Sequence, residues 1–217
     1  RVAIARALAV SPRLLLMDEP LAAVDATRKQ DILPYIESLH RELDIPVIHV
    51  SHLHEEVARL ADHLVLMDEG RVLATGDVHE VFTRLDLPLA HGAGAESIIE
   101  AEVLAYDEAY QLARLGFPGG EFLVAMRAVE PGSPLRMRVA ARDVSLTLER
   151  QTGTSILNIL QCRVDDLSEE SNAQVKVRLL AGPTPLLAGI TRKSADELGL
   201  QHGKTVFAQV KSIALLN

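Results

Sequence analysis

Two adjacent carboxylates follow a short apolar run near the start of the sequence. Residues 14–20 read Leu-Leu-Leu-Met-Asp-Glu-Pro, which places the carboxylates at Asp18 and Glu19. The run is typical of a buried strand, and open α/β sheets bind ligands at the carboxyl ends of their strands. One carboxylate there can hold Mg²⁺, and its neighbour can polarise a water for attack on a γ-phosphate. The pattern predicts Asp18 as the metal residue and Glu19 as the base, although a plain acidic turn after a buried strand would look the same.

Two further residues follow in an order that suits this chemistry. Asp25 comes six residues after Glu19, and His52 lies two residues after the end of the next β-prone run, at 47–50. A histidine behind the strand next to the carboxylates could reach the same phosphate. A lone histidine at such a place is more often structural, so the prediction for His52 depends on its companions.

The elements that must position these residues form an α/β pattern in the first half of the chain. Apolar runs at 14–17 and 47–50, with a helical pattern over 26–43 between them, predict a βαβ unit with parallel strands. The runs at 63–67 and 71–74 flank Asp-Glu-Gly and predict a hairpin that closes the edge of the sheet. A short helix is expected over 78–85.

The second half is predicted to be mostly β. Residues 87–95 are rich in Pro, Gly and small side chains without a period, so we divide the chain into an α/β domain at 1–90, a linker at 91–96 and a β domain at 97–217. The β domain repeats itself, because residues 131–146 resemble 202–215. Two lobes of roughly 50–60 residues fit small five-stranded barrels of the oligomer-binding type.

Composition narrows the class of protein. The chain has 22 basic and 30 acidic residues, a net charge of −8, which argues against nucleic acid as a partner. Its single cysteine, Cys162, excludes an internal disulfide. Apolar runs fall short of the roughly 20 residues that a membrane-spanning helix needs. The sequence opens on Arg1 inside a helical pattern, so we expect the natural protein to contain more residues upstream.

Taken in order, these motifs resemble the ABC transporter ATPase family. The Asp18-Glu19 strand resembles the family's Walker B strand, Asp25 its D-loop and His52 its switch histidine, while residues 1–8 resemble the helix after its signature sequence. The hairpin at 67–72 resembles the family's closing hairpin, so the resemblance covers the whole first half.

The resemblance implies an ATPase that uses ATP and Mg²⁺. Glu19 and His52 are then catalytic, Asp18 and Asp25 bind the cofactor, and Asp18 holds the metal. In this family the D-loop lies at a dimer interface, which implies a homodimer of ATPase subunits. The 217 residues contain neither a G-x-x-x-x-G-K-[ST] phosphate loop nor the glycine-rich signature. We therefore expect the full-length subunit to hydrolyse ATP and this chain alone to be inactive.

Residues 154–217 resemble the molybdate-binding, molbindin-like domain, of the TOBE type, at the end of molybdate importer ATPases. A tetrahedral oxyanion binds to hydroxyls, to backbone N–H groups at turns and to nearby cations. The residues that offer these groups, with one amide, are Thr154, Ser155, Asn158, Ser194, Lys211 and Ser212. Ser194 has an alternative role as the cap of a helix over 195–198. Leu157 stands where the pattern often has a basic residue, so one expected cation is missing.

Together the two resemblances imply the ATPase subunit of an ABC importer for molybdate or tungstate, with an oxyanion-sensing tail. The implied partners are integral membrane permease subunits, at the cytoplasmic face of the inner membrane. Three alternatives stay open: an importer ATPase for sulfate, a sugar or a polyamine; a tail that serves only dimerisation; and a free-standing oxyanion-binding protein. A transcription regulator is disfavoured, because the chain is acidic and has no helix-turn-helix candidate.

Overall fold

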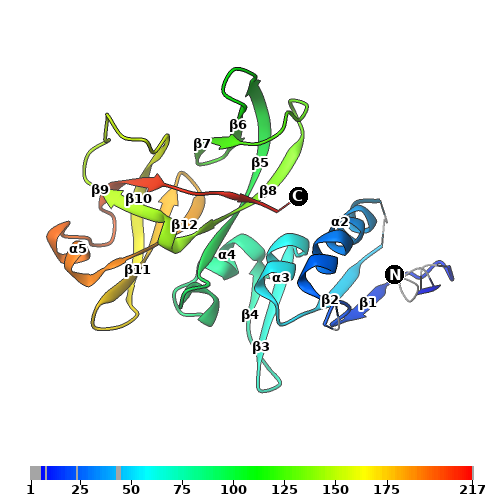
Figure 1. Cartoon of the computed structure of the whole chain (residues 1–217). Coiled ribbons are helices and arrows are strands. Elements are labelled where there is room, and N and C mark those ends of the chain that lie inside the picture. The colour runs from blue at the N-terminus through cyan, green and yellow to red at the C-terminus, as the bar shows by residue number, and fades with distance from the viewer. Residues whose placement is uncertain (1–5, 8, 23, 43–44, 217) are drawn as a thin grey trace. The chain divides into compact units, whose positions relative to one another are not determined.

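The computed structural model describes residues 6–7, 9–22, 24–42 and 45–216 (Figure 1). The helix expected over 1–8 therefore lies largely outside the described residues. The chain forms two compact units, Arg1–Asp62 and His63–Asn217. Among the described residues no helix is both long and apolar enough to cross a membrane.

The first unit contains the predicted βαβ arrangement. Its elements are β1 (Leu15–Asp18), α2 (Ala26–Glu42), β2 (Val47–Val50) and α3 (His54–Leu60). The two strands pair in parallel, with Asp18 opposite Val50, as a helical crossover requires. The buried faces of β1 and α2 form a small core of Leu15, Met17, Leu21, Leu33 and Ile36.

The second unit opens with the predicted hairpin, β3 (His63–Asp68) and β4 (Arg71–Asp77), followed by α4 (Val78–Thr83). Asp68 pairs with Arg71, so Glu69 and Gly70 alone form the turn, and both have positive φ, at 46° and 75°. This combination defines a type I′ turn, which matches the twist of the two strands. Asp77 caps the start of this helix, because its Oδ1 accepts a hydrogen bond from His79 N at 2.8 Å.

Replacing Glu69 with asparagine is expected to stabilise this hairpin. Asparagine tolerates the left-handed region better than glutamate, so we expect a gain of about 0.5–1 kcal/mol, or roughly 2 °C in Tm. The same exchange at Glu108, an exposed loop residue without positive φ, is the matched control. Thermal melts of both variants test the prediction, and an equal gain in both would contradict it.

The β-rich part of the second unit contains two sets of five strands. The first set is β5 (Glu96–Asp107), β6 (Leu112–Phe117), β7 (Gly120–Ala125), β8 (Pro134–Ala140) and β9 (Val144–Thr147). The second set is β10 (Asn158–Glu169), β11 (Gln174–Ala181), β12 (Thr184–Thr191), β13 (Thr205–Val210) and β14 (Ala214–Leu215). Short helical turns are η1 (Pro88–Ala90), η2 (Ala141–Asp143) and α5 (Arg192–Glu197).

The two sets form two lobes that exchange their last strand. The sheets have the orders β14-β8-β5-β6-β7 and β9-β13-β10-β11-β12, so each fifth strand pairs in the other lobe's sheet. Both first strands carry a bulge at the corresponding place, after Val103 in β5 and after Val164 in β10. Gly132 N donates to Val103 O and Gly203 N to Val164 O, both at 2.8 Å. These matching details support the duplication inferred from residues 131–146 and 202–215.

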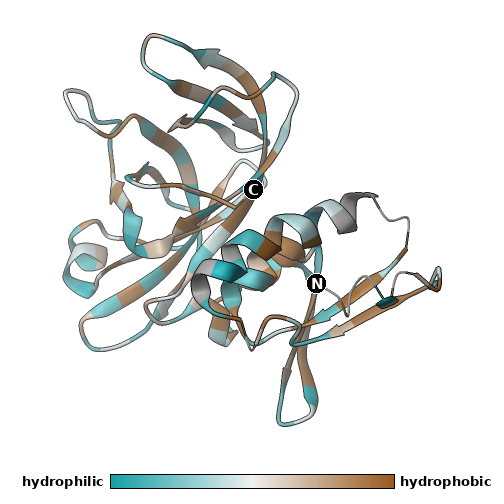
Figure 2. Cartoon of the chain, turned by 45° about the vertical axis from the view of Figure 1, so that its right-hand side comes forward, coloured by the Kyte–Doolittle hydropathy of each residue, from teal (hydrophilic) through white to brown (hydrophobic). Residues whose placement is uncertain are grey.

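The exchange joins the lobes in one hydrophobic core. Buried side chains from both sheets belong to a single cluster, from Ile99 and Phe122 in the first lobe to Leu179 and Val206 in the second. Figure 2 shows the corresponding alternation of polar and apolar residues along the strands. The turns of the lobes also meet, since a Cβ on Gly119 would lie 2.3 Å from Ala181 O. Neither lobe completes its sheet without the other.

The segment predicted as a linker, 91–96, contacts both lobes. Lys176 Nζ donates to Gly92 O at 3.0 Å, Gly92 N donates to the carboxylate of Glu170, and Arg142 Nη1 donates to Ala93 O at 3.4 Å. These contacts hold the segment in place, and its assignment as a linker stays a prediction. The compact units divide between Asp62 and His63. The assignment of residues 1–90 to one domain stays a prediction.

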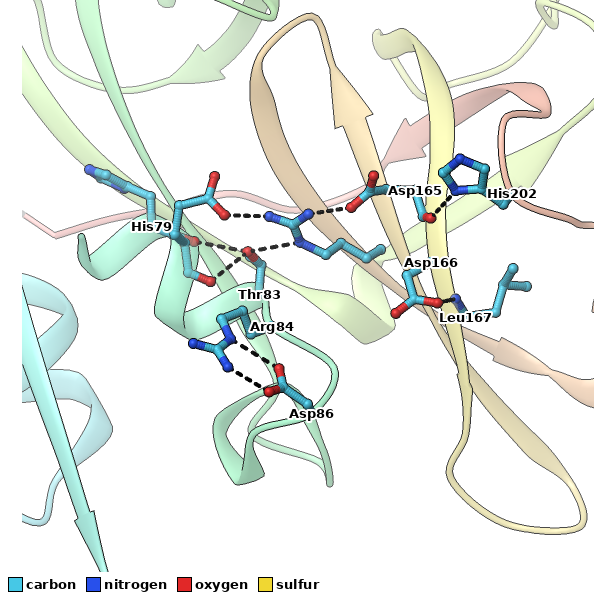
Figure 3. A network of polar contacts seen from close by, with 10 residues as sticks. His79, Thr83, Arg84, Asp86, Asp165, Asp166, Leu167 and His202 are labelled. Carbon is cyan, nitrogen blue, oxygen red and sulfur yellow. Dashed lines mark hydrogen bonds and ion pairs between the residues drawn. The ribbon is translucent and has the colours of Figure 1, made fainter. Parts of the chain in front are cut away.

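An ion cluster fastens α4 to the second lobe (Figure 3). Arg178, on β11, contacts the carboxylates of Asp165, on β10, and Glu80, on α4, and its Nε lies 3.5 Å from Thr83 Oγ1. Asp165 is the extra residue of the β10 bulge, so it has no partner in the ladder with β11. Its side chain and that of Arg178 are only 25% and 14% exposed, so removal of either one leaves the other poorly solvated.

Candidate functional site

Glu19 and His52 meet at the carboxyl ends of the two parallel strands. Glu19 N donates to Val50 O at 2.9 Å, which continues the pairing of β1 with β2. His52 Nδ1 lies 2.9 Å from Glu19 Oε1. Because a carboxylate only accepts, Nδ1 is the donor, and Nε2 remains as the ring nitrogen not engaged with Glu19. The side chains are 67% and 46% exposed, so both can be reached from solvent.

Glu19 adopts a backbone conformation that glutamate rarely takes. Its φ is 42°, in the left-handed region. Such a conformation costs about 1–2 kcal/mol for a residue with a Cβ, and residues of this kind concentrate at functional sites. The sharp turn directly after β1 directs the chain away from the strand while Glu19 N keeps its bond to Val50 O.

The two aspartates of the first half have different surroundings. Asp18, the last residue of β1, is exposed, and its carboxylate makes no hydrogen bond or ion pair within the described part of the chain. Asp25 has a local role at the start of α2, where its Oδ1 accepts from Arg28 N at 3.0 Å and its Oδ2 pairs with Arg28 Nε at 3.4 Å. This is the geometry of a helix cap.

Magnesium fits the donor at Asp18. Mg²⁺ prefers oxygen ligands and is held by one or two carboxylates, with water and phosphate oxygens completing the shell. Among the described residues no group of three or more His, Cys, Asp or Glu side chains could form a protein-only metal site. An exposed strand-end carboxylate without a partner therefore suits a metal that arrives with a nucleotide.

A buried carboxylate lies behind His52 and was not identified from the sequence. Glu56, on α3, is 3% exposed and accepts from Ser51 Oγ at 2.8 Å, Lys29 Nζ at 3.2 Å and His49 Nε2 at 3.4 Å. Burial alone would raise the pKa of Glu56, but these three donors together lower it below the ordinary 4.5. Nothing in the Glu-Glu pair at 55–56 distinguishes the buried residue from the exposed one, so the sequence carries no signal for it.

The six predicted oxyanion residues do not converge on one place in the chain. Asn158 pairs with Val210 at one end of the β10–β13 ladder, so Thr154, Ser155, Lys211 and Ser212 lie in the segments that adjoin that end. Ser194, on α5, follows Thr191, which pairs with Gln174 beside the far end of β10. Within one chain the antiparallel ladder therefore separates Ser194 from the rest, and the assignment of these six residues to an oxyanion site stays a prediction.

Several of these side chains already have partners. Both polar atoms of the Asn158 amide bind the backbone of Leu123 in β7, with Oδ1 accepting at 2.7 Å and Nδ2 donating at 3.0 Å. Ser97, in the corresponding place of the first lobe, likewise accepts from Leu187 N at 2.8 Å. Asn158 thus joins the two sheets.

The hydroxyls of Thr154 and Ser194 also make local hydrogen bonds. Thr154 Oγ1 accepts from Ile156 N at 3.1 Å. The helix cap predicted at Ser194 is instead Thr191, whose Oγ1 accepts from Ser194 N at 3.1 Å and lies 2.7 Å from Ser194 Oγ. The helix begins at Arg192, three residues earlier than expected, because threonine caps it there.

The second lobe resembles a known domain, and the whole chain resembles known proteins. Residues 154–216, which include β10 to β14, match the TOBE domain. The chain is 56% identical over 217 residues to the molybdenum import ATP-binding protein ModC of Methylococcus capsulatus and 56% identical over 217 residues to ModC 1 of Azotobacter vinelandii. Both alignments cover 100% of this chain but only 61% and 60% of those proteins.

The relatives confirm the predicted resemblance to the molybdate importer ATPase, and the chain spans about three fifths of their length. A crystal structure of the cytoplasmic molybdate-binding protein ModG with molybdate bound aligns with 54% of this chain and 94% of that one. The two chains are 21% identical, with a TM-score of 0.46.

Proposed function

We propose that this chain is part of the ATP-hydrolysing subunit of an ABC importer that energises the uptake of molybdate or tungstate. The observation that carries the proposal is the contact between Glu19 and His52 at the ends of two parallel strands, 2.9 Å apart. Identity of 56% to molybdenum import ATP-binding proteins supports it over the whole chain. In this view the first unit is the later part of a P-loop α/β domain, and the rest of the nucleotide site lies on residues that the chain does not contain.

In the proposed reaction Glu19 polarises the attacking water. Its contact with Nδ1 of His52 orients the imidazole and leaves Nε2 for the γ-phosphate. Asp18 would hold Mg²⁺, which when bound neutralises negative charge on the phosphates. Asp25, at the start of α2, is proposed to face a second ATPase subunit across a homodimer interface.

The tail is proposed to bind the transported oxyanion. Ser194 lies at the opposite end of the β10–β13 ladder from Lys211 and Ser212. An oxyanion site that contains these three residues therefore requires Ser194 from a second copy of the chain. This agrees with the proposed homodimer. Asn158 then positions the segment that bears Thr154 and Ser155 through its bonds to Leu123. The subunit would act at the cytoplasmic face of the inner membrane, bound to integral membrane permease subunits.

Calorimetric titration of the 217-residue chain with molybdate tests the proposed ligand. We expect saturable binding of molybdate that an equal concentration of sulfate or phosphate does not reproduce. Lys211→Ala should weaken binding by about tenfold or more, since it removes a charge-assisted hydrogen bond. Lys193→Ala is the matched control, because this exposed lysine pairs with Glu197 at 3.6 Å. Absence of binding by the folded chain would reduce the tail to a structural module and reopen the choice of solute.

A further inference from the structure

The contact between Glu19 and His52 is too exposed to define its own geometry. The side chains are 46% and 67% exposed, and ion pairs in water contribute little net stability. A catalytic pair nevertheless needs a stable separation and orientation, because small misplacements lower the rate strongly. The restraint must therefore come from neighbouring groups that are shielded from solvent.

Glu56 provides such a restraint directly behind His52. Its carboxylate accepts from Ser51 Oγ, and that same oxygen accepts from Leu53 N at 3.1 Å. One buried carboxylate thus fixes the residues on both sides of His52 in the chain. The exposed neighbour Glu55 lies on the same first turn of α3 but has no place in this arrangement.

The same carboxylate connects the His52 loop to two other elements. Lys29, on α2, donates to Oε1, and His49, on β2, donates to Oε2. Lys29 N also donates to Asp25 O at 2.9 Å, which links the arrangement to the start of α2. The carboxylate of Glu56 therefore accepts hydrogen bonds from a helix, a strand and a loop. These bonds determine how the three segments lie relative to one another.

We infer that Glu56 is a positioning residue that, through Ser51, holds the His52 loop so that the imidazole contacts Glu19. The inference rests on the proposed ATPase reaction for its functional meaning, while the positioning itself is a property of this chain. The ordinary ionised state of Glu56, which its donors favour by lowering its pKa, suits this role.

The first test measures the ring nitrogens of His52 in the 217-residue chain by ¹⁵N NMR. In the wild type we expect the signals of an imidazole with its proton on Nδ1, because Nδ1 donates to Glu19. Glu56→Gln and Ser51→Ala should shift the signals towards a mixture of tautomers, whereas Glu55→Gln should not. A purely structural role would lower Tm without changing the ring signals of the folded protein, and that result would overturn the inference.

Glu56→Gln leaves Lys29 without its carboxylate and could fail to fold. Ser51→Ala then decides, because it removes the link to the loop and leaves Glu56 with Lys29 and His49. Unchanged ring signals in folded Ser51→Ala would overturn the inference. The double variant Lys29→Met/Glu56→Gln, which removes both charges, should shift the signals as Ser51→Ala does.

The second test uses protein as long as the ModC relatives. Glu56→Gln is expected to lower kcat for ATP hydrolysis by about 10- to 100-fold with KM for ATP little changed, and Glu55→Gln should behave as wild type. Unchanged kcat in an active enzyme would overturn the inference and leave the proposed ATPase intact. If the wild-type protein shows no ATP hydrolysis, the proposed function fails, and the ring-nitrogen signals alone decide whether Glu56 positions His52.

Discussion

Glu19→Gln is expected to lower kcat for ATP hydrolysis by about 10²–10⁴-fold in protein of the relatives' length. Glutamine keeps the size of the side chain but cannot take a proton from the attacking water. It can still accept from His52 Nδ1, so nucleotide binding should change little and KM for ATP should stay near the wild-type value. Steady-state hydrolysis assays, with phosphate release as the readout, measure both constants.

The control and the companion variant make this test specific. Glu69→Gln changes an exposed glutamate of the β3–β4 turn and should leave kcat unchanged. His52→Ala should lower kcat by a comparable factor, and the double variant should be little worse than either single one, because residues that act as a unit are not additive. A Glu19→Gln enzyme within a few-fold of wild type would contradict the assignment of Glu19 as the base.

Arg178→Met is expected to destabilise the second unit by about 2–4 kcal/mol, somewhat less than the roughly 3–5 kcal/mol for breaking a fully buried ion pair. Methionine fills similar space but leaves the carboxylates of Asp165 and Glu80 and the hydroxyl of Thr83 without their donor (Figure 3). The side chain of Asp165 is 25% exposed and that of Glu80 is 53% exposed. Water can therefore replace the lost hydrogen bond better at Glu80 than at Asp165. For this reason we do not expect the full cost of breaking a completely buried pair.

Denaturant unfolding of the 217-residue chain, with hydrogen exchange on α4, measures this effect. Amides of α4 should lose protection before those of β10 and β11, since the cluster joins the helix to these strands. Arg178→Lys should recover only part of the loss, because an ammonium group cannot serve three acceptors with the planar geometry of guanidinium. Arg163→Met, at an exposed position of β10, is the control and should stay within about 0.5 kcal/mol. Equal stability of both methionine variants would contradict the role of the cluster.

Local patterns in the sequence predicted the main elements around the candidate site. The apolar runs at β1 and β2, the helical pattern between them and the Glu-Gly turn of the β3–β4 hairpin reflect side-chain periodicity and turn chemistry, which act over a few residues. The same reasoning identified Glu19 and His52, because their place after two parallel strands brings them to one edge of the sheet. The internal repeat was likewise visible as a repeated string of turn and strand residues.

Tertiary structure decided the remaining features, because they depend on contacts between distant residues. The bulge at Asp165 interrupts the ladder between β10 and β11, and it depends on the pairing of these two strands. The exchange of β9 and β14 between lobes, the anchoring of Gly92 by Lys176 and the separation of Ser194 from Lys211 follow from strand pairing across long stretches of chain. Glu56 is the clearest case: Glu55 and Glu56 are chemically identical, and only the packing of α3 against Lys29, His49 and Ser51 buries one of them.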